Sequence, residues 1–310
     1  MSGLDLVCGG CGFIGSHMVA ALLESGRTVR VLDDLSTGYT HNIKDMDCEF
    51  VHADAADSKA ALAACDGVER IFHFGARPSV PWSFQEPELA YHANHGTTLS
   101  LIEAASQAGV KRLVFSSSSA IYGDSPELPK AESMAPAPKS PYAEHKLAGE
   151  IALHAAASAG RLEAASLRYF NVYGPRQDPS SPYSGVISLF AKWVKEGRDP
   201  TFFGDGQQTR DFVYVADVVK ANLLAAEAPQ PEAAPIYNVA TGTSISIAEL
   251  WNTMCMVASR AAGIPEFLEA REGDVRHSSA SLNKIQRDTG FAAEVSLRDG
   301  IQLTLDSLTD

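Results

Sequence analysis

The sequence predicts an α/β fold, in which a doubly wound parallel sheet is joined to a smaller mixed α/β C-terminal domain. Strand-like and helical runs alternate along the first half of the chain, and a glycine-rich turn follows the first strand-like run. Such alternation is typical of a parallel sheet with crossover helices. With 310 residues, the chain is long enough to bury a large core in one large or two modest domains.

The expected strands are short apolar runs at residues 4–7, 28–32, 49–52, 70–74, 112–116 and 163–167. The segments between them are rich in alanine and leucine, which favours helices on both faces of the sheet, at residues 16–25, 58–65, 88–108 and 142–159. After residue 167 this alternation ends. Prolines and glycines are dense from 169 to 210, which predicts loops around one helix at 186–196, and further helices are expected at 215–226, 247–262 and 297–308.

Three glycines, Gly9, Gly12 and Gly15, lie between the first strand and the first helix. Without side chains there, the backbone can approach a pyrophosphate, and the helix N-terminus can direct its unpaired N–H groups at the phosphates. Asp33 ends the second strand, where a carboxylate can bind both hydroxyls of an adenosine ribose and repel a 2′-phosphate. A glycine turn alone also suits an ordinary strand–helix connection. Together with Asp33, it predicts a site for NAD rather than NADP.

These features indicate a nucleotide-binding domain of the Rossmann type followed by a substrate-binding domain. We expect the first to comprise residues 1–168 with returning segments near 212–240, and the second to comprise 169–211 and 241–310. The crevice between them is the expected substrate site, because ligands of open parallel sheets bind beyond the carboxyl ends of the strands.

Composition argues against several classes of protein. The net charge of −13 disfavours nonspecific binding of nucleic acid. No apolar run approaches the length of a membrane span, and no signal-peptide pattern follows Met1, so we expect a soluble cytoplasmic protein without a membrane partner. Cys8 and Cys11 form a Cys-x-x-Cys pair, but no second pair follows. Two small residues that fill a tight turn are therefore favoured over a zinc or redox site, and no metal is expected.

A tyrosine, a lysine and a run of serines have the residue types that proton transfer requires. Tyr142 and Lys146 share one face at the start of a helix that Ser140 and Pro141 signal. A phenol has a pKa of about 10, and lowering it to about 7 requires roughly 4 kcal/mol, which an ammonium and a charged nicotinamide could supply together. The serines at 116–119 follow a strand at the ligand-binding edge. Taken singly, these features are also common on helix surfaces and in turns.

Together, the motifs resemble the extended short-chain dehydrogenase/reductases, and within them the NAD-dependent nucleotide-sugar epimerases that act on UDP-N-acetylglucosamine (UDP-GlcNAc) or UDP-glucose. The resemblance covers nearly the whole chain and rests on residues 9–17, 32–38, 115–123, 140–146, 167–176, 204–213 and 271–278.

This resemblance implies a role for each matching residue. Ser118 is expected to relay a proton, Tyr142 to act as the base, and Lys146 to lower the pKa of Tyr142 and hold the nicotinamide ribose. The expected NAD contacts are Gly9, Gly12, Phe13, Ile14, Gly15, Asp33, Asp34, Ser36, Thr37, Gly38, Asp54, Ala55, Phe74, Ala76, Asn94, Ser116, Tyr142, Lys146 and Tyr169. The expected substrate contacts are Ser118, Ser119, Tyr142, Asn171, Val186, Phe203, Arg210, Arg271, Asp274 and Ser278.

Within the substrate set, Asn171, Arg210 and Arg271 are expected on the diphosphate of a UDP-sugar, because arginine forks match phosphate oxygens. Asp274 is expected on the uridine ribose and Phe203 against the uracil. The resemblance further implies a homodimer, which pairs the helices at 88–108 and 142–159 as a four-helix bundle.

The serine run and Ser278 bear on reaction type and substrate. Family members that eliminate water carry an acid at this edge, whereas residues 117–119 are all serine. The expected activity is therefore that of an isomerase, a 4-epimerase that works through a transient 4-keto sugar and regenerates NAD in each turnover. In similar epimerases the residue at this position lines the sugar pocket, so the resemblance implies that the small Ser278 favours UDP-GlcNAc and its C4 epimer UDP-GalNAc, with UDP-glucose and UDP-galactose as a further pair. A UDP-glucuronate 4-epimerase, another NAD-dependent nucleotide-sugar enzyme, and a non-catalytic NAD-binding regulator remain alternatives.

Overall fold

The computed structural model describes residues 3–178, 185–230, 233–270 and 275–308. Its largest sheet has seven strands in the order β10-β6-β5-β4-β1-β2-β3, and all neighbouring strands in it are parallel. These strands are β1 (Leu4–Cys8), β2 (Thr28–Asp33), β3 (Glu49–His52), β4 (Val68–His73), β5 (Arg112–Ser118), β6 (Glu163–Tyr169) and β10 (Ile236–Val239). The expected fold class is confirmed, and each expected strand-like run lies in this sheet.

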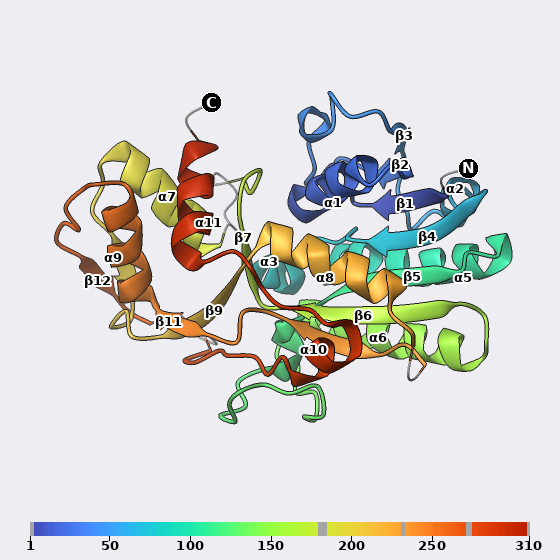
Figure 1. Cartoon of the computed structure of the whole chain (residues 1–310). Helices are drawn as coiled ribbons and strands as arrows, with labels where there is room; N and C mark the ends of the chain where they lie inside the picture. The colour runs from blue at the N-terminus through green and yellow to red at the C-terminus, as the bar shows by residue number, and fades with distance from the viewer. Residues whose placement is uncertain (1–2, 179–184, 231–232, 271–274, 309–310) are drawn as a thin grey trace.

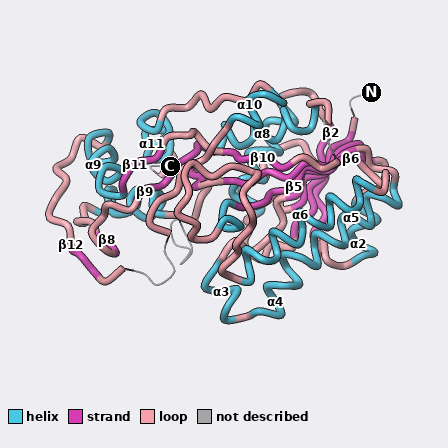
Figure 2. Tube along the Cα trace, turned by 90° about the horizontal axis from the view of Figure 1, so that it is seen from below, coloured by secondary structure: helices cyan, strands magenta, loops and turns pink. Residues whose placement is uncertain are grey.

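Helices cover both faces of the large sheet (Figure 2). One face carries α1 (Phe13–Glu24), α8 (Val215–Glu227) and α10 (Asn283–Thr289), and the other carries α2 (Ser58–Ala64), α5 (Thr97–Ala108) and α6 (Pro141–Ser158). Each face has its own apolar cluster, with Leu22 and Ile285 in one and Leu101 and Leu153 in the other. None of the helices in the described part of the chain is both long and apolar enough to span a bilayer.

The strand order places a crevice at the centre of the large sheet. From β1, the chain first runs outward through β2 to β3, and then returns to the other side of β1 with β4, β5 and β6. The crossover connections therefore diverge between β1 and β4. In sheets of this kind, ligands bind beyond the carboxyl ends of the strands at that point.

A second lobe lies beyond the carboxyl ends of these strands (Figure 1). It contains a sheet in the order β11-β9-β7 and a pair β12-β8. Its elements are β7 (Asn171–Tyr173), α7 (Val186–Glu196), β8 (Thr201–Phe203), β9 (Thr209–Tyr214), β11 (Ser244–Ser246), α9 (Ile247–Val257), β12 (Glu266–Leu268) and α11 (Leu297–Asp306). Phe190 and Trp251 are buried in its apolar cluster. The boundaries of the two expected domains stay a prediction, and Ile285, from the segment assigned to the second, packs in a cluster of the large sheet.

Three expectations about the elements are wrong in part. Residues 169–210 do contain the expected helix α7, but β7, β8 and the start of β9 also lie there. Strands of three residues show no measurable alternation, and they form here because partners distant in sequence lie beside them. The helix expected at 88–108 is divided into α4 (Pro87–Tyr91), a π-helical turn (His92–Gly96) and α5. Helix α9 ends at Val257, short of the expected residue 262, and Ser259 beyond it has a left-handed backbone.

A buried ion pair joins α6 to the large sheet. Arg168 in β6 donates to Glu150 on α6 through Nε to Oε1 at 2.9 Å and through Nη2 to Oε2 at 2.7 Å. Ser117 Oγ in β5 donates to Glu150 Oε1 at 2.6 Å. The two charged side chains are each only 2% exposed. Removing one partner of such a pair leaves an uncompensated charge in the interior, which is strongly destabilising.

We predict that Glu150→Ala lowers the free energy of unfolding by about 3–5 kcal/mol, because it leaves the Arg168 guanidinium buried without its counter-ion. Urea denaturation measures this change. Glu103→Ala is the matched control, since Glu103 pairs with Arg161 at the surface and exposed pairs contribute little to stability. Equal losses in the two variants would contradict the proposed importance of the buried pair.

Candidate active site

The turn between β1 and α1 requires glycine. Gly9 has a φ of 79°, and a Cβ added there would lie 2.7 Å from the backbone nitrogen of Gly75. A Cβ on Gly15 would overlap the carbonyl oxygen of Gly9. Helix α1 begins at Phe13, and no side chain caps its N-terminus. The turn therefore leaves an open backbone cradle, and the first N–H groups of the helix can bind the phosphates of a dinucleotide.

Asp33 is held at the edge of this cradle. It accepts hydrogen bonds from the backbone N–H of Cys11 at 2.9 Å and of Leu35 at 2.8 Å, one on each carboxylate oxygen. Burial raises the pKa of Asp33, and these two hydrogen bonds lower it. Each oxygen keeps a further lone pair for a ribose hydroxyl. Asp34 accepts from the N–H of Ser36 at 2.8 Å, so the loop after β2 is ordered around the expected adenosine contacts.

The π-helical turn supplies a second observation that fits a bound dinucleotide. Asn94 in this turn is buried, and its Oδ1 accepts the backbone N–H of Arg77 at 2.8 Å. Its Nδ2 is buried and has no hydrogen-bond partner among the described residues. Buried donors are nearly always paired in native proteins, so an unpaired one is consistent with a ligand contact. The residues present therefore fit the expected dinucleotide.

Other expected cofactor contacts already have partners within the protein. Asp54 accepts from the N–H of Ala56 at 2.8 Å and pairs with His92 at 2.9 Å at the surface. The phenol of Tyr169 is buried and exchanges hydrogen bonds with the side chain of Asn222. Phe74 directly follows β4 and donates its N–H to Cys8 at 2.8 Å, which places the segment with Ala76 beside the glycine turn.

The expected catalytic residues come together where β5 ends and α6 begins. Ser140 caps α6 by accepting the N–H of Ala143 at 3.2 Å, and Pro141 opens the helix. Lys146 Nζ donates to the carbonyl of Ser116 at 2.7 Å and lies 5.9 Å from the ring centroid of Tyr142. Ser118 ends β5, and its hydroxyl lies near enough to the Tyr142 phenol to lower the pKa of that phenol. The structure therefore brings the expected proton relay, the expected base and the expected lysine together at one site.

Burial opposes the charged forms of both titratable residues in this site. Burial raises the pKa of Tyr142, and the hydrogen bond with Ser118 lowers it. Burial also lowers the pKa of Lys146 to about 7, against the opposing charges of Cys8 and Glu150. Burial raises the pKa of the Cys8 thiol far above neutrality, so this thiol is uncharged. Of the two groups, only Glu150 therefore carries a negative charge that favours the protonated form of Lys146. Without a bound cofactor, the protein thus favours a neutral Tyr142 phenol and a Lys146 amine that is only partly protonated near pH 7.

Three of the expected substrate residues lie on or beside β9 in the second lobe. Asn171 pairs in register with Phe212 of β9 and donates through Nδ2 to the carbonyl of Asp211 at 3.1 Å. Arg210 lies in β9 itself, and Ser278 donates its N–H to the carbonyl of Thr209 at 3.1 Å. Phe203 ends β8, Val186 opens α7, and Ser119 opens the turn after β5. Arg271 and Asp274 lie outside the described residues.

Asp211 supports this group and is not among the residues expected to bind ligands. It is fully buried and accepts hydrogen bonds from Thr241 at 2.7 Å through Oγ1, from the N–H of Gly242 at 2.9 Å and from the N–H of Ala280 at 3.3 Å. These hydrogen bonds attach β9, next to Arg210, to Thr241 and Gly242 and to Ala280, which lies two residues after Ser278. The sequence offers one signal for this supporting role, which is the position of Asp211 beside Arg210 in the motif at 204–213.

Comparisons with known proteins agree with this geometry. The model of the NAD dependent epimerase/dehydratase family matches residues 6–240. A UDP-glucose 4-epimerase of Mycolicibacterium smegmatis is 39% identical over 307 residues, which cover 97% of both chains.

Solved structures extend the agreement to the fold. A UDP-N-acetylglucosamine 4-epimerase from Methanobrevibacter ruminantium, in complex with UDP-N-acetylmuramic acid, superposes with a TM-score of 0.94 at 34% identity and covers 100% of this chain and 99% of its own. A UDP-glucose 4-epimerase of Thermus thermophilus in complex with NAD gives a TM-score of 0.89 at 38% identity, with 99% of both chains covered. The chain therefore belongs to the NAD-dependent epimerase/dehydratase family.

Proposed function

We propose that this NAD-dependent UDP-sugar 4-epimerase interconverts UDP-GlcNAc and UDP-GalNAc, and that it also accepts UDP-glucose and UDP-galactose. The assembly of Ser118, Tyr142 and Lys146 at the end of β5 carries the proposal. No acid stands in the serine run at 117–119 that could assist elimination of water. A protein that only bound NAD would need none of these three side chains in this arrangement, which disfavours a regulator without activity.

The geometry suits reversible removal of a proton from a sugar hydroxyl. Bound NAD supplies a hydride acceptor and donor at its nicotinamide ring. Ser118 receives the proton of the C4 hydroxyl and passes its own proton to the Tyr142 phenolate, whose pKa it lowers. Lys146 stabilises that phenolate by its charge and holds the nicotinamide ribose. The same groups return the proton after the keto sugar has turned, so that the other C4 epimer forms.

The second lobe supplies the proposed grip on the nucleotide. Asn171 and Arg210 lie on adjacent strands, β7 and β9. We place them on the diphosphate, with Arg271, because bidentate guanidinium–phosphate contacts are strong and directional. The backbone of Ser278 is fixed to β9, so its small side chain leaves room in the sugar pocket for an N-acetyl group at C2.

We predict that Ser118→Ala shifts the pH dependence of kcat to higher pH. The Ser118 hydroxyl lowers the pKa of Tyr142 by hydrogen bonding to it. Without that bond the phenolate forms only at higher pH, and loss of the relay also lowers kcat by about 10²- to 10⁴-fold. A pH–rate profile on UDP-glucose measures both effects. Tyr142→Phe is the control, which should bind NAD normally and lose turnover at every pH; undiminished turnover there would refute the assigned base.

We further predict that Ser278→Tyr removes activity on UDP-GlcNAc and spares activity on UDP-glucose. The added ring fills the space proposed for the N-acetyl group, whereas the C2 hydroxyl of glucose still fits. Wild type and variant are each incubated with UDP-GlcNAc, UDP-glucose and UDP-glucuronate, and the products are identified. Ser279→Tyr, at the neighbouring position, is the matched control. Equal loss on both hexoses in Ser278→Tyr would refute the steric explanation, and turnover of UDP-glucuronate alone would favour the alternative substrate.

An exposed apolar face on the helices of the large-sheet lobe supports the proposed homodimer. Leu89 and Tyr91 on α4, Leu99 on α5 and Ile151 on α6 are 57, 50, 41 and 62% exposed. A set of large apolar side chains exposed on neighbouring helices is typical of an interface. We propose that a second copy of the chain covers this face.

Ile151→Asp is therefore expected to convert a dimer into a monomer, because it places a charge at the centre of an apolar interface. Sedimentation velocity measures the change in mass. Ile264→Asp is the control, since Ile264 is 82% exposed in the second lobe. A monomeric wild type would refute the proposal directly.

A further inference from the structure

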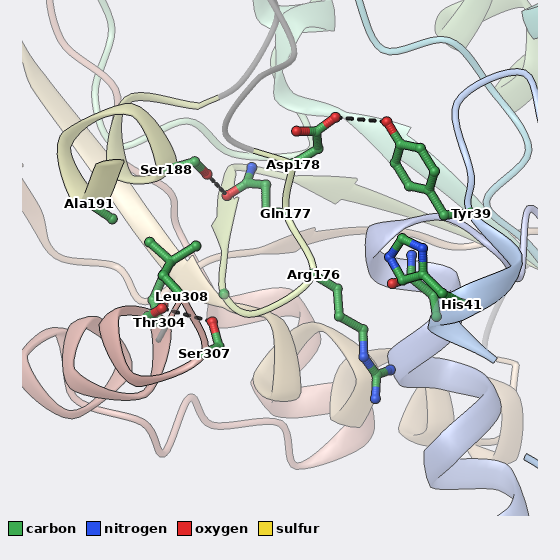
Figure 3. Close-up of a pocket in the computed structure, with 12 residues that line it drawn as sticks. Tyr39, His41, Arg176, Gln177, Asp178, Ser188, Ala191, Thr304, Ser307 and Leu308 are labelled. Atoms are coloured by element: carbon green, nitrogen blue, oxygen red, sulfur yellow. Dashed lines mark hydrogen bonds between the residues drawn. The ribbon is translucent and has the colours of Figure 1, made fainter. Parts of the chain in front are cut away.

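A cavity of about 310 Å³ lies where the two lobes meet, apart from the catalytic residues (Figure 3). Tyr39 and His41, from the loop after β2, form one side of it. Helices α7 and α11 of the second lobe form the opposite side, and residues 174–178, which follow β7, run between them. We call residues 174–178 the strap. Its position beside the loop that carries Ser36, Thr37 and Gly38 raises the question of what it contributes to cofactor binding.

The strap is fastened to both lobes. On the side of the large sheet, His17 on α1 donates from Nε2 to the carbonyl of Pro175 at 2.9 Å. Burial lowers the pKa of His17 to about 4, so this contact is one between neutral groups at physiological pH. On the side of the second lobe, Ser188 Oγ on α7 donates to Gln177 Oε1 at 2.5 Å. The strap therefore crosses the crevice instead of lying on either lobe.

A third fastening starts from the glycine turn itself. Tyr39 donates its phenolic hydroxyl to Asp178 Oδ2 at 2.9 Å, and Figure 3 shows the two side chains meeting end to end. The backbone N–H of Tyr39 donates to the carbonyl of Cys11 at 3.0 Å, and Asn42 Nδ2 donates to the same carbonyl at 2.9 Å. Gly38 packs so closely on Cys11 that an added Cβ would lie 2.9 Å from it. Tyr39 thus contacts the strap through Asp178 and the phosphate cradle through Cys11.

Arg176 places a positive charge in the same region. Its backbone is left-handed, with a φ of 65°, which residues other than glycine rarely adopt. Its side chain extends from the strap toward the large-sheet lobe in Figure 3. Its positive charge is close enough to His17 on α1 to lower the pKa of that histidine, in addition to the larger effects of burial and the hydrogen bond to Pro175. Burial is the only influence on the pKa of Arg176 itself, and no carboxylate of the described residues pairs with it. A cation beside the N-terminal half of α1 adds to the positive end of the helix dipole, and both favour an anion.

We propose that the strap is a further part of the NAD site, in which Arg176 is a cation for the pyrophosphate and the Tyr39–Asp178 hydrogen bond is a latch that opens before NAD leaves. The proposal rests on the placement of the pyrophosphate at the glycine turn. It also suits the reaction: the hydride taken from C4 returns to the same sugar, so each turnover ends with the cofactor in its starting state. If the cofactor left before the hydride returned, the oxidised sugar could not be reduced again. A cofactor that stays bound does not slow turnover.

The latch is tested by the rate at which NAD leaves the full-length protein. Protein loaded with isotope-labelled NAD is mixed with excess unlabelled NAD, and bound label is followed with time. Tyr39→Phe removes only the hydroxyl, and we expect release to become about threefold to tenfold faster, as loss of one solvent-exposed hydrogen bond implies. In the Tyr39→Phe, Asp178→Ala cycle the two effects should be non-additive, because each variant removes the same contact. Unchanged release, or additive effects, would overturn the latch.

The cation is tested by equilibrium binding of NAD to cofactor-stripped protein at several salt concentrations. Arg176→Asn removes the charge and keeps a residue that tolerates the left-handed backbone, so the strap can retain its course. We expect affinity to fall about tenfold to a hundredfold, with a weaker dependence on salt, and Arg176→Lys to recover part of it. Arg198→Asn is the matched control, an exposed arginine of the second lobe that pairs with Glu196. Equal affinities in all variants would overturn the role of Arg176.

Two further measurements separate the possible failures. Asp33→Asn alters the proposed ribose contact and does not touch the strap. If it weakens NAD binding while the strap variants do not, the strap proposal fails and the cofactor placement stands; if none of the variants affects NAD, the placement itself fails. The melting temperature, measured with and without NAD, distinguishes a structural role of Tyr39 from a role in cofactor binding. If Tyr39→Phe lowers the melting temperature as much without NAD as with it, the proposal is also overturned.

Discussion

The buried pair of Glu150 and Arg168 is the constraint on which the catalytic edge depends. Glu150 lies one helical turn beyond Lys146 on α6, and its carboxylate binds Arg168 of β6 and Ser117 of β5 together. One group therefore fixes the helix that carries Tyr142 against the strand that carries Ser118. A buried carboxylate with a single partner would be costly, and three directional hydrogen bonds leave it one stable position.

The burial that fixes this edge also opposes the charges that the chemistry requires. It raises the pKa of Tyr142 and lowers that of Lys146 to about 7. The hydrogen bond with Ser118 compensates only in part, so the protein without its cofactor holds a neutral phenol. A positively charged nicotinamide placed nearby favours the phenolate by direct attraction. Cofactor binding and activation of the base are thus coupled by electrostatics, which gives retention of NAD a second advantage beyond keeping the hydride in place.

Much of the large-sheet lobe could be predicted because its signals are local. The apolar runs of β1 to β6 are long enough to be recognised, and the glycine turn is dictated by sterics, since a side chain at Gly15 would collide with the carbonyl of Gly9. The spacing of Tyr142 and Lys146 placed them on one helical face. The strands β7 and β8 escaped prediction because three residues carry no periodicity, and the π-helical turn around Asn94 interrupts what reads as one helix.

The sequence by itself indicated the parallel sheet, the phosphate cradle and the acid at its edge, because the apolar runs and the glycine turn that predict them are local patterns. Of the expected catalytic residues, only Tyr142 and Lys146 are close together in the chain; Ser118 meets them through the packing of β5 against α6. Only the tertiary structure decided how the lobes meet. Tyr39 and Asp178 are 139 residues apart, and Asp211 joins segments that no spacing relates. Such contacts depend on where two separately folded surfaces come together, and the pattern within either segment contains no information about its distant partner.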